Sequence, residues 1–93
     1  KKNKGILVCG SGEGMGMVAN KFPDVRAAVR CKEEAAKKSR EHNDANVLSI
    51  SGWELNEPKM KKIVKAWLET KFSGGRHARR LKKIAQIEKE NFK

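Results

Sequence analysis

The stretch that decides the fold is Gly5-Ile6-Leu7-Val8-Cys9-Gly10-Ser11-Gly12-Glu13-Gly14-Met15-Gly16. Its first half is an apolar run without alternation, which is typical of a parallel strand buried on both faces. The glycines that follow predict a sharp turn at the end of this strand. A short helix is expected over residues 17–20, and Pro23 ends it. A strand, a glycine-rich turn and a helix in this order predict an α/β fold.

The rest of the chain continues the alternation of strands and helices. Two further strands are predicted at 25–31 and 47–50, with a helix between them over 32–41 whose inner face carries Ala35, Ala36 and Ser39. The next helix is indicated by one apolar stripe at helical spacing: Met60, Ile63, Val64, Trp67 and Leu68. A final helix begins near Arg76 and is expected to turn these residues inward: Leu81, Ile84, Ala85 and Phe92.

These elements predict a three-layer, Rossmann-like α/β fold, here a partial parallel sheet of about three strands with flanking helices. We expect one partial domain over 1–93, in which 1–75 hold the βα units with the glycine loop and 76–93 form the carboxy-terminal helix.

The composition limits the classes of function. The chain has 93 residues and a formal net charge of +11, from 22 Lys and Arg against 11 Asp and Glu. The basic residues are spread along helices and aromatic residues are few, so binding to nucleic acid is not expected. The longest apolar run is too short for a bilayer and no signal-peptide pattern is visible, so we expect a cytoplasmic protein with no membrane partner. The two cysteines do not make a disulfide framework, and Cys31 is expected to be a small buried residue.

The glycine-rich turn is a candidate anion site. It fails the dinucleotide fingerprint, because the sixth position counted from Gly10 is Met15. Nevertheless, a strand, a glycine loop and a helix start together present backbone N–H groups and positive potential to an anion. A tight turn without a ligand is the alternative. Cys9 precedes the loop, and a thiolate beside such amides has the position of a base that abstracts a proton next to a carbonyl.

Three other side chains are candidates for a site. His42 lies at a helix end that should run away from the glycine loop, so from one subunit it is expected to be a helix-capping cation; a symmetric partner could bring it to another chain's loop. Arg76 and Arg80 are four residues apart on one helix face, which suits a phosphate group. An exposed basic turn explains these two arginines equally well.

Several segments resemble the B-type ribose-5-phosphate isomerases closely and in order: 5–15, Ala19-Asn20-Lys21, 25–28, Ser39-Arg40-Glu41-His42-Asn43-Asp44-Ala45-Asn46-Val47-Leu48 and Phe72-Ser73-Gly74-Gly75-Arg76-His77-Ala78-Arg79-Arg80. The resemblance spans nearly the whole chain. The related galactose-6-phosphate isomerase subunits share the fold. The resemblance therefore implies an aldose–ketose isomerase of sugar phosphates, with ribose 5-phosphate and ribulose 5-phosphate as the expected pair and a role in the pentose phosphate pathway.

The resemblance also implies roles for individual residues. Cys9 matches the base that moves a proton between C1 and C2 through an enediolate, and Ser11 matches a hydroxyl that assists proton transfer. The substrate's enediolate oxygen is expected on the loop amides: Gly10, Gly12, Glu13 and Gly14. His42 matches a histidine implicated in opening the sugar ring, with Asn43 as its hydrogen-bonding neighbour, and Arg76 and Arg80 match the arginines that hold the phosphate. No metal or cofactor is implied, and a homodimer or tetramer with sites shared between subunits is expected.

Three departures from the family pattern matter. The family begins with about two βα units that have no counterpart here, including an Asp-His pair that contacts the substrate. The chain is therefore expected to be a fragment, or a half that needs a separate amino-terminal segment, with an uncovered apolar edge. A non-catalytic phosphosugar-binding fragment is the alternative function. Trp53 stands where an Arg is often found, and Glu13 is a weak competitor to Cys9 for the role of base.

Overall fold

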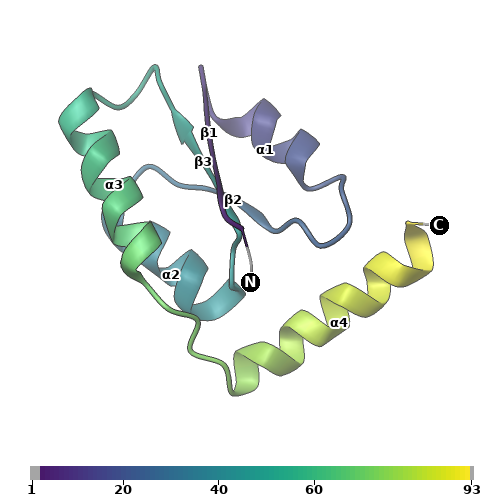
Figure 1. The fold of residues 1–93 in the computed structure, drawn as a ribbon. Helices are drawn as coiled ribbons and strands as arrows, with labels where there is room; N and C mark the ends of the chain where they lie inside the picture. Colours follow the sequence, from purple (N-terminus) through teal and green to yellow (C-terminus); the bar gives the residue numbers. More distant parts are fainter. Residues whose placement is uncertain (1–2, 93) are drawn as a thin grey trace.

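Three parallel strands form one sheet within residues 3–92, the part of the chain that the computed structural model describes. Three helices cover its two faces, and a fourth, at the carboxy-terminal end, lies apart from the sheet (Figure 1). The elements in chain order are β1 (Gly5–Cys9), α1 (Glu13–Ala19), β2 (Ala27–Val29), α2 (Glu33–Asn43), β3 (Val47–Ser51), α3 (Glu57–Glu69) and α4 (Arg76–Asn91). The predicted α/β class and the partial parallel sheet are confirmed.

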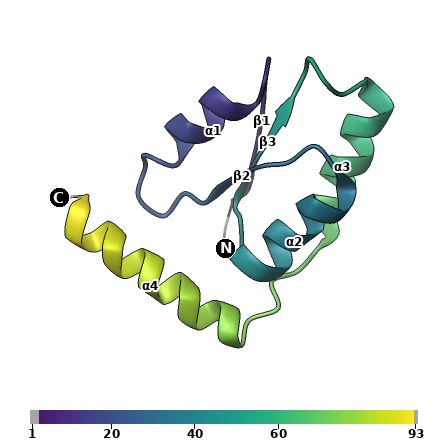
Figure 2. The ribbon, with the colours of Figure 1, turned by 180° about the vertical axis from the view of Figure 1, so that it is seen from behind.

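The strand order is β1-β3-β2, so the last strand in the chain lies between the other two. Its register runs from Gly5 opposite Val47 to Cys9 opposite Ser51. Helix α1 covers one face of the sheet, and α2 and α3 cover the other, as Figures 1 and 2 both show. The neighbouring strands β1 and β3 are thus followed by helices on opposite faces. In an open α/β sheet, such a change of side leaves a crevice at the carboxyl ends of the two strands.

The core lies between the sheet and the pair α2 and α3. It contains these buried residues: Ala28, Ala36, Ala45, Leu48, Ile50, Leu55, Ile63 and Trp67. Helix α3 begins after Asn56, whose side chain accepts a hydrogen bond from the amide of Lys59 at 3.0 Å and caps the helix. The apolar stripe predicted for this helix is correct except at Leu68, which is 48% exposed.

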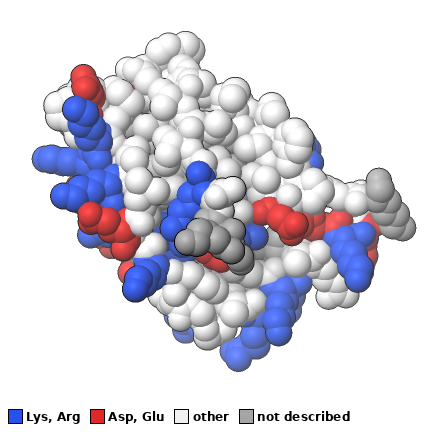
Figure 3. Space-filling view, viewed as in Figure 1, with Lys and Arg blue, Asp and Glu red and all other residues white. Residues whose placement is uncertain are grey.

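Strand β1 is not buried on both faces as its apolar run predicts. It lies at the edge of the sheet, and Ile6 and Val8 are 37% and 56% exposed. A broad uncharged area covers this part of the surface in Figure 3, whereas Lys and Arg gather over α3 and α4. A cleft follows this edge on the α3 side. Charged residues of α3 contribute to its lining, and its apolar lining residues are Ile6, Val8, Ile50, Met60, Val64 and Leu68. The expected uncovered apolar edge is therefore present.

Other sequence expectations fail at element boundaries. The second strand has only the three residues of β2, so Cys31 lies beyond it and is exposed rather than buried. Helix α1 begins at Glu13, four residues earlier than expected.

Helix α4 does not turn its apolar residues into the core as the sequence predicts, because none of its residues is buried. Ile84 and Phe92 line a cleft of about 730 Å³ between α4 and the β2 side of the sheet. Among residues 3–92, no helix is both long and apolar enough to cross a bilayer.

Candidate functional site

The loop after β1 brings the sulfur of Cys9 to a backbone amide. Gly12 N–H donates a hydrogen bond to Cys9 Sγ at 3.1 Å. Gly12 is buried and has φ +83°, a conformation that L-residues rarely adopt, so a glycine is required at this point. The predicted proximity of Cys9 to the loop amides is confirmed. A hydrogen bond from an N–H group stabilises a thiolate more than a thiol, which suits a base.

Helix α1 begins directly at this loop. The first turn of a helix leaves N–H groups without intrahelical acceptors. One of them, the amide of Glu13, donates to Ser11 Oγ at 3.2 Å. The side chains of Ser11 and Glu13 are exposed, as is Gly14, so this side of the loop is open to a ligand.

Two serine hydroxyls of β3 fix the loop, and sequence reasoning missed both. Ser49 Oγ donates to Gly12 O and Ser51 Oγ donates to Gly10 O, each at 2.6 Å. Both serines are almost fully buried. These bonds turn two carbonyls of the loop toward the sheet. The sequence Val47-Leu48-Ser49-Ile50-Ser51 could have revealed these two residues. Ser49 and Ser51 alternate with apolar residues in a buried strand, where each hydroxyl needs a hydrogen-bond partner.

The end of β3 places an aromatic side chain beside the same loop. Gly52 N–H donates to Cys9 O at 2.7 Å, and Trp53 N–H donates to Gly10 O at 3.1 Å. The indole of Trp53 lies so close to Gly10 that a Cβ atom there would overlap with it. The carboxyl ends of β1 and β3 therefore bring together Cys9, the amides of the loop and one indole ring. We call these residues, Cys9 to Gly14 with Trp53, the loop half-site.

A second group of candidate residues gathers where α2 ends and α4 begins. The rings of His42 and His77 stack with centroids 4.4 Å apart and planes inclined by 15°. Arg76 and Arg80 are exposed on the same helix as His77, and Asn43 is exposed next to His42. Desolvation and the nearby positive charges of His42, Arg76 and Arg80 lower the pKa of His77 below 6.5. We call this group the helix half-site: His42, Asn43, Arg76, His77 and Arg80.

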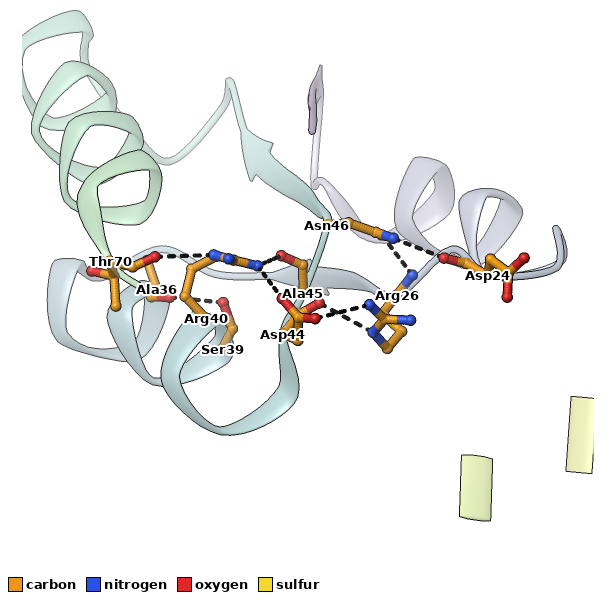
Figure 4. Close-up of polar contacts among 9 residues, drawn as sticks. All are labelled: Asp24, Arg26, Ala36, Ser39, Arg40, Asp44, Ala45, Asn46 and Thr70. Carbon is orange, nitrogen blue, oxygen red and sulfur yellow. Dashed lines mark hydrogen bonds and ion pairs between the residues drawn. The ribbon is translucent and has the colours of Figure 1, made fainter. Parts of the chain in front are cut away.

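An ion-pair network holds the end of α2 in place (Figure 4). Asp44 has a left-handed backbone with φ 47° and accepts from Arg40 Nη1 at 2.9 Å and from Arg26 Nη2 at 3.4 Å. Arg40 is 6% exposed and also donates to Ala45 O at 2.6 Å. Its guanidinium lies over the Trp67 ring, 5.7 Å from the ring centre. The turn that carries His42 and Asn43 is thereby fixed to the core.

The two half-sites lie at opposite ends of the sheet. The loop half-site follows the carboxyl end of β1, while α2 ends just before the amino end of β3. A five-residue strand separates these ends by about 13 Å or more. In Figure 1, α4 starts below the sheet, at the end opposite to the loop between β1 and α1. The structure thus brings Cys9 together with the loop glycines, and His42 together with the α4 arginines, but it does not bring the two groups together within one chain.

The residues 3–92 contain no cluster of three His, Cys, Asp or Glu side chains that could hold a metal ion.

Comparison with known proteins gives consistent matches. Residues 1–84 match the family model described as Ribose/Galactose Isomerase. The chain is 44% identical over 84 residues to ribose-5-phosphate isomerase B of Escherichia coli, covering 90% of this chain and 56% of that protein. It is 42% identical over 90 residues to the putative sugar phosphate isomerase YwlF of Bacillus subtilis, covering 97% of this chain and 60% of that protein.

Solved structures agree with these matches. The ribose-5-phosphate isomerase B of Mycoplasma genitalium, crystallised with bound ribulose-5-phosphate, superposes with a TM-score of 0.95 at 44% identity, over 98% of this chain and 60% of that one. The enzyme of Clostridium thermocellum gives a TM-score of 0.91 at 46% identity, over 94% of this chain and 59% of that one. The chain therefore spans about three fifths of the length of these proteins.

Proposed function

Because this chain belongs to the ribose/galactose isomerase family, we propose that it carries two half-sites of a sugar-phosphate aldose–ketose isomerase. Ribose 5-phosphate and ribulose 5-phosphate are the favoured substrate and product. Relatives that are named ribose-5-phosphate isomerase B, and one bound to ribulose-5-phosphate, support this choice. The observation that carries the proposal is the 3.1 Å hydrogen bond from Gly12 N–H to Cys9 Sγ, at the carboxyl end of β1.

In the proposed reaction the Cys9 thiolate takes the proton from C2 of the open-chain aldose and returns it to C1. The electron pair of the broken C–H bond forms the enediolate, so the reaction needs no external oxidant or reductant. The amides of the loop from Gly10 to Gly14 stabilise the negative oxygen. The Ser11 hydroxyl transfers a proton between the two substrate oxygens. Glu13 is exposed at the start of α1, whereas the sulfur of Cys9 accepts a hydrogen bond from the loop, so we assign the role of base to Cys9.

The helix half-site supplies the other functions that an isomerase of a cyclic sugar phosphate requires. His42 and Asn43 open the sugar ring, and Arg76 and Arg80 bind the phosphate. Since these residues lie at the far end of the sheet from Cys9 in one chain, a second copy must bring them to the loop. A two-fold dimer does this twice, because each subunit then offers one loop half-site and one helix half-site.

Mixing inactive variants tests this arrangement. Cys9→Ala damages only the loop half-site and His42→Ala damages only the helix half-site. A mixed dimer of the two has one intact site, so unfolding and refolding an equal mixture should recover about a quarter of wild-type turnover. A mixture of His42→Ala with Arg80→Ala is the matched control, because both changes affect the same half-site and no intact site can form. Equal recovery in both mixtures would contradict shared sites.

A phosphosugar-binding half that needs a separate amino-terminal segment is the second candidate. The observation that favours it is the open apolar edge of β1 together with the match to only about three fifths of each relative. Turnover of ribose 5-phosphate by the purified chain, measured with and without the unmatched segment of a relative, distinguishes the two. Full turnover by the chain alone defeats the second candidate, and turnover that appears only on addition of the segment supports it.

A further inference from the structure

Trp53 is the most exposed of the large apolar side chains in residues 3–92. Its exposed fraction is 83%, against 64% for Met17, the next in order. A tryptophan at this exposure contributes little to the core, and Trp53 does not line the apolar cleft beside β1 and α3. The open edge of the sheet at β1 therefore does not explain why Trp53 is exposed. Exposed tryptophan rings are typical of binding surfaces, because they combine a large rigid apolar face with one polar N–H group.

The backbone and the ring of Trp53 both contact the glycine loop. Its N–H group donates to Gly10 O at 3.1 Å. The benzo part of its indole lies over Gly10, where atoms Cε2, Cζ2 and Cη2 occupy the space that a Cβ atom would need. Gly10 directly follows Cys9, and the Cα atoms of neighbouring residues are about 3.8 Å apart. An open aromatic face thus lies one residue from the proposed base.

Polar groups belong to the same glycine loop as the Gly10 backbone that the ring covers. The side chain of Ser11, the residue after Gly10, is exposed. A flat apolar surface with a few hydrogen-bonding groups at its margin fits a sugar, which has C–H groups on its ring faces and hydroxyls around its rim. A partner protein would favour a continuous apolar area, and that area lies in the cleft along β1 rather than at Trp53.

We propose that Trp53 is a substrate-binding residue whose indole stacks on the carbon skeleton of the phosphosugar, and so selects for the sugar part of the substrate rather than for its phosphate. This inference rests on the proposed function, because it requires that the loop half-site bind a sugar phosphate. It adds a residue that contacts the substrate carbons, whereas the loop amides contact oxygens and the arginines contact the phosphate. Trp53 therefore contributes affinity for ribose 5-phosphate and none for inorganic phosphate.

The chain offers an internal reference for the test, because its other tryptophan, Trp67, is completely buried in the core. Titration with ribose 5-phosphate should change the emission of Trp53, and titration with inorganic phosphate should leave it unchanged. In calorimetry, Trp53→Ala should weaken ribose 5-phosphate binding about tenfold and leave binding of inorganic phosphate unaltered. Trp53→Phe keeps an aromatic ring and should weaken the binding of ribose 5-phosphate less than Trp53→Ala does. Because the side chain is exposed, both variants should unfold at the wild-type urea concentration.

Each alternative result has a definite meaning. Wild-type affinity for ribose 5-phosphate in Trp53→Ala would overturn the role of Trp53 and leave the proposed function standing. No binding of ribose 5-phosphate to the wild-type chain would overturn the proposed function, and this inference with it. A smaller oligomer in Trp53→Ala, with unchanged affinity for the sugar phosphate, would assign the indole to an interface between copies and overturn the inference.

Discussion

The backbone amide of Gly12 donates a hydrogen bond to the sulfur of Cys9 across 3.1 Å. This contact joins the last residue of β1 to the residue that precedes α1. It is possible because Gly12 has φ +83° and because Ser49 Oγ holds the carbonyl of the same residue at 2.6 Å. The position of the candidate base therefore depends on a single buried glycine and on one hydroxyl of the neighbouring strand.

Two glycines of the loop should respond to alanine in opposite directions. Gly12→Ala places a Cβ atom 3.1 Å from the backbone carbon of Ile50 and forces alanine to φ +83°, so it should destabilise the fold by about 1–2 kcal/mol or more. Gly14 lies within α1 with open space around it, so Gly14→Ala should stabilise the fold by about 0.5–1 kcal/mol. Urea unfolding of both variants measures the difference. Equal effects would contradict the assigned backbone conformation.

Removing the charge of Asp44 should destabilise the chain strongly. Asp44→Asn leaves the buried Arg40 without its carboxylate partner, and we expect a loss of about 1–3 kcal/mol in the free energy of unfolding. The exposed pair between Lys61 and Glu57, at 3.1 Å, offers a matched control. Glu57→Gln should change stability by about 0.5 kcal/mol or less. Unfolding of the two variants at the same urea concentration would show that the Asp44 carboxylate does not stabilise Arg40.

The stacked histidines should make the helix half-site sensitive to pH. Since desolvation and the charges of His42, Arg76 and Arg80 lower the pKa of His77, the unfolded chain binds this proton more tightly than the folded chain. The contribution of His77 to stability is therefore complete above pH 6.5 and is lost as the pH falls through the lowered pKa.

An NMR titration of the histidine ring protons measures this effect. His42→Ala should raise the pKa of His77 toward 6.5, because it removes one of the lowering charges. Arg79 is not among those charges, so Arg79→Gln is the control and should leave the pKa of His77 where it is. Identical titration curves for the two variants would show that the stack does not exist in solution.

The open edge of β1 should drive association of the chain with itself. Val8 is 56% exposed on β1, which pairs with β3 on one side and has a free outer edge, and a lysine there opposes edge-to-edge pairing. Val8→Lys should reduce light scattering at high protein concentration and leave the urea midpoint nearly unchanged. Lys38→Ala, at an exposed position of α2 outside this cleft, is a control that should not reduce the scattering. If the wild-type chain scatters as little light as Val8→Lys, the edge of β1 does not drive self-association.

Local patterns in the sequence predicted the layers of this fold well. The stripe of α3 predicts its buried face because helical periodicity depends only on the segment itself. The apolar run of β1 predicts a strand correctly but not its exposure, which depends on how many neighbouring strands the sheet contains. Gly16 was expected in a loop, yet it lies in α1 packed against Val29 and Ser49, where a Cβ atom would collide with the Val29 side chain. That glycine serves close helix–sheet packing, which only the assembled sheet reveals.

The candidate site was also predictable only where it depends on residues that are neighbours in the chain. Cys9 and its loop were predictable, because a strand end and the glycine turn after it are neighbours in the chain. The contact between His42 and His77 was not, because it depends on how α4 approaches the end of α2. The hydroxyls of Ser49 and Ser51 were missed because their acceptors belong to a loop about forty residues earlier, with sequence separations of 37 and 41.

Proton exchange at the substrate tests the role of Cys9 most directly. Ribulose 5-phosphate is incubated in D₂O with the preparation that shows turnover, and deuterium at C1 and C2 is followed by NMR. In Cys9→Ala we expect exchange and turnover to fall about 10²–10⁴-fold, while ribose 5-phosphate still binds with nearly wild-type affinity. Cys9→Ala that exchanges deuterium at the wild-type rate would show that another group is the base, and the account of this sulfur and its amide would be wrong.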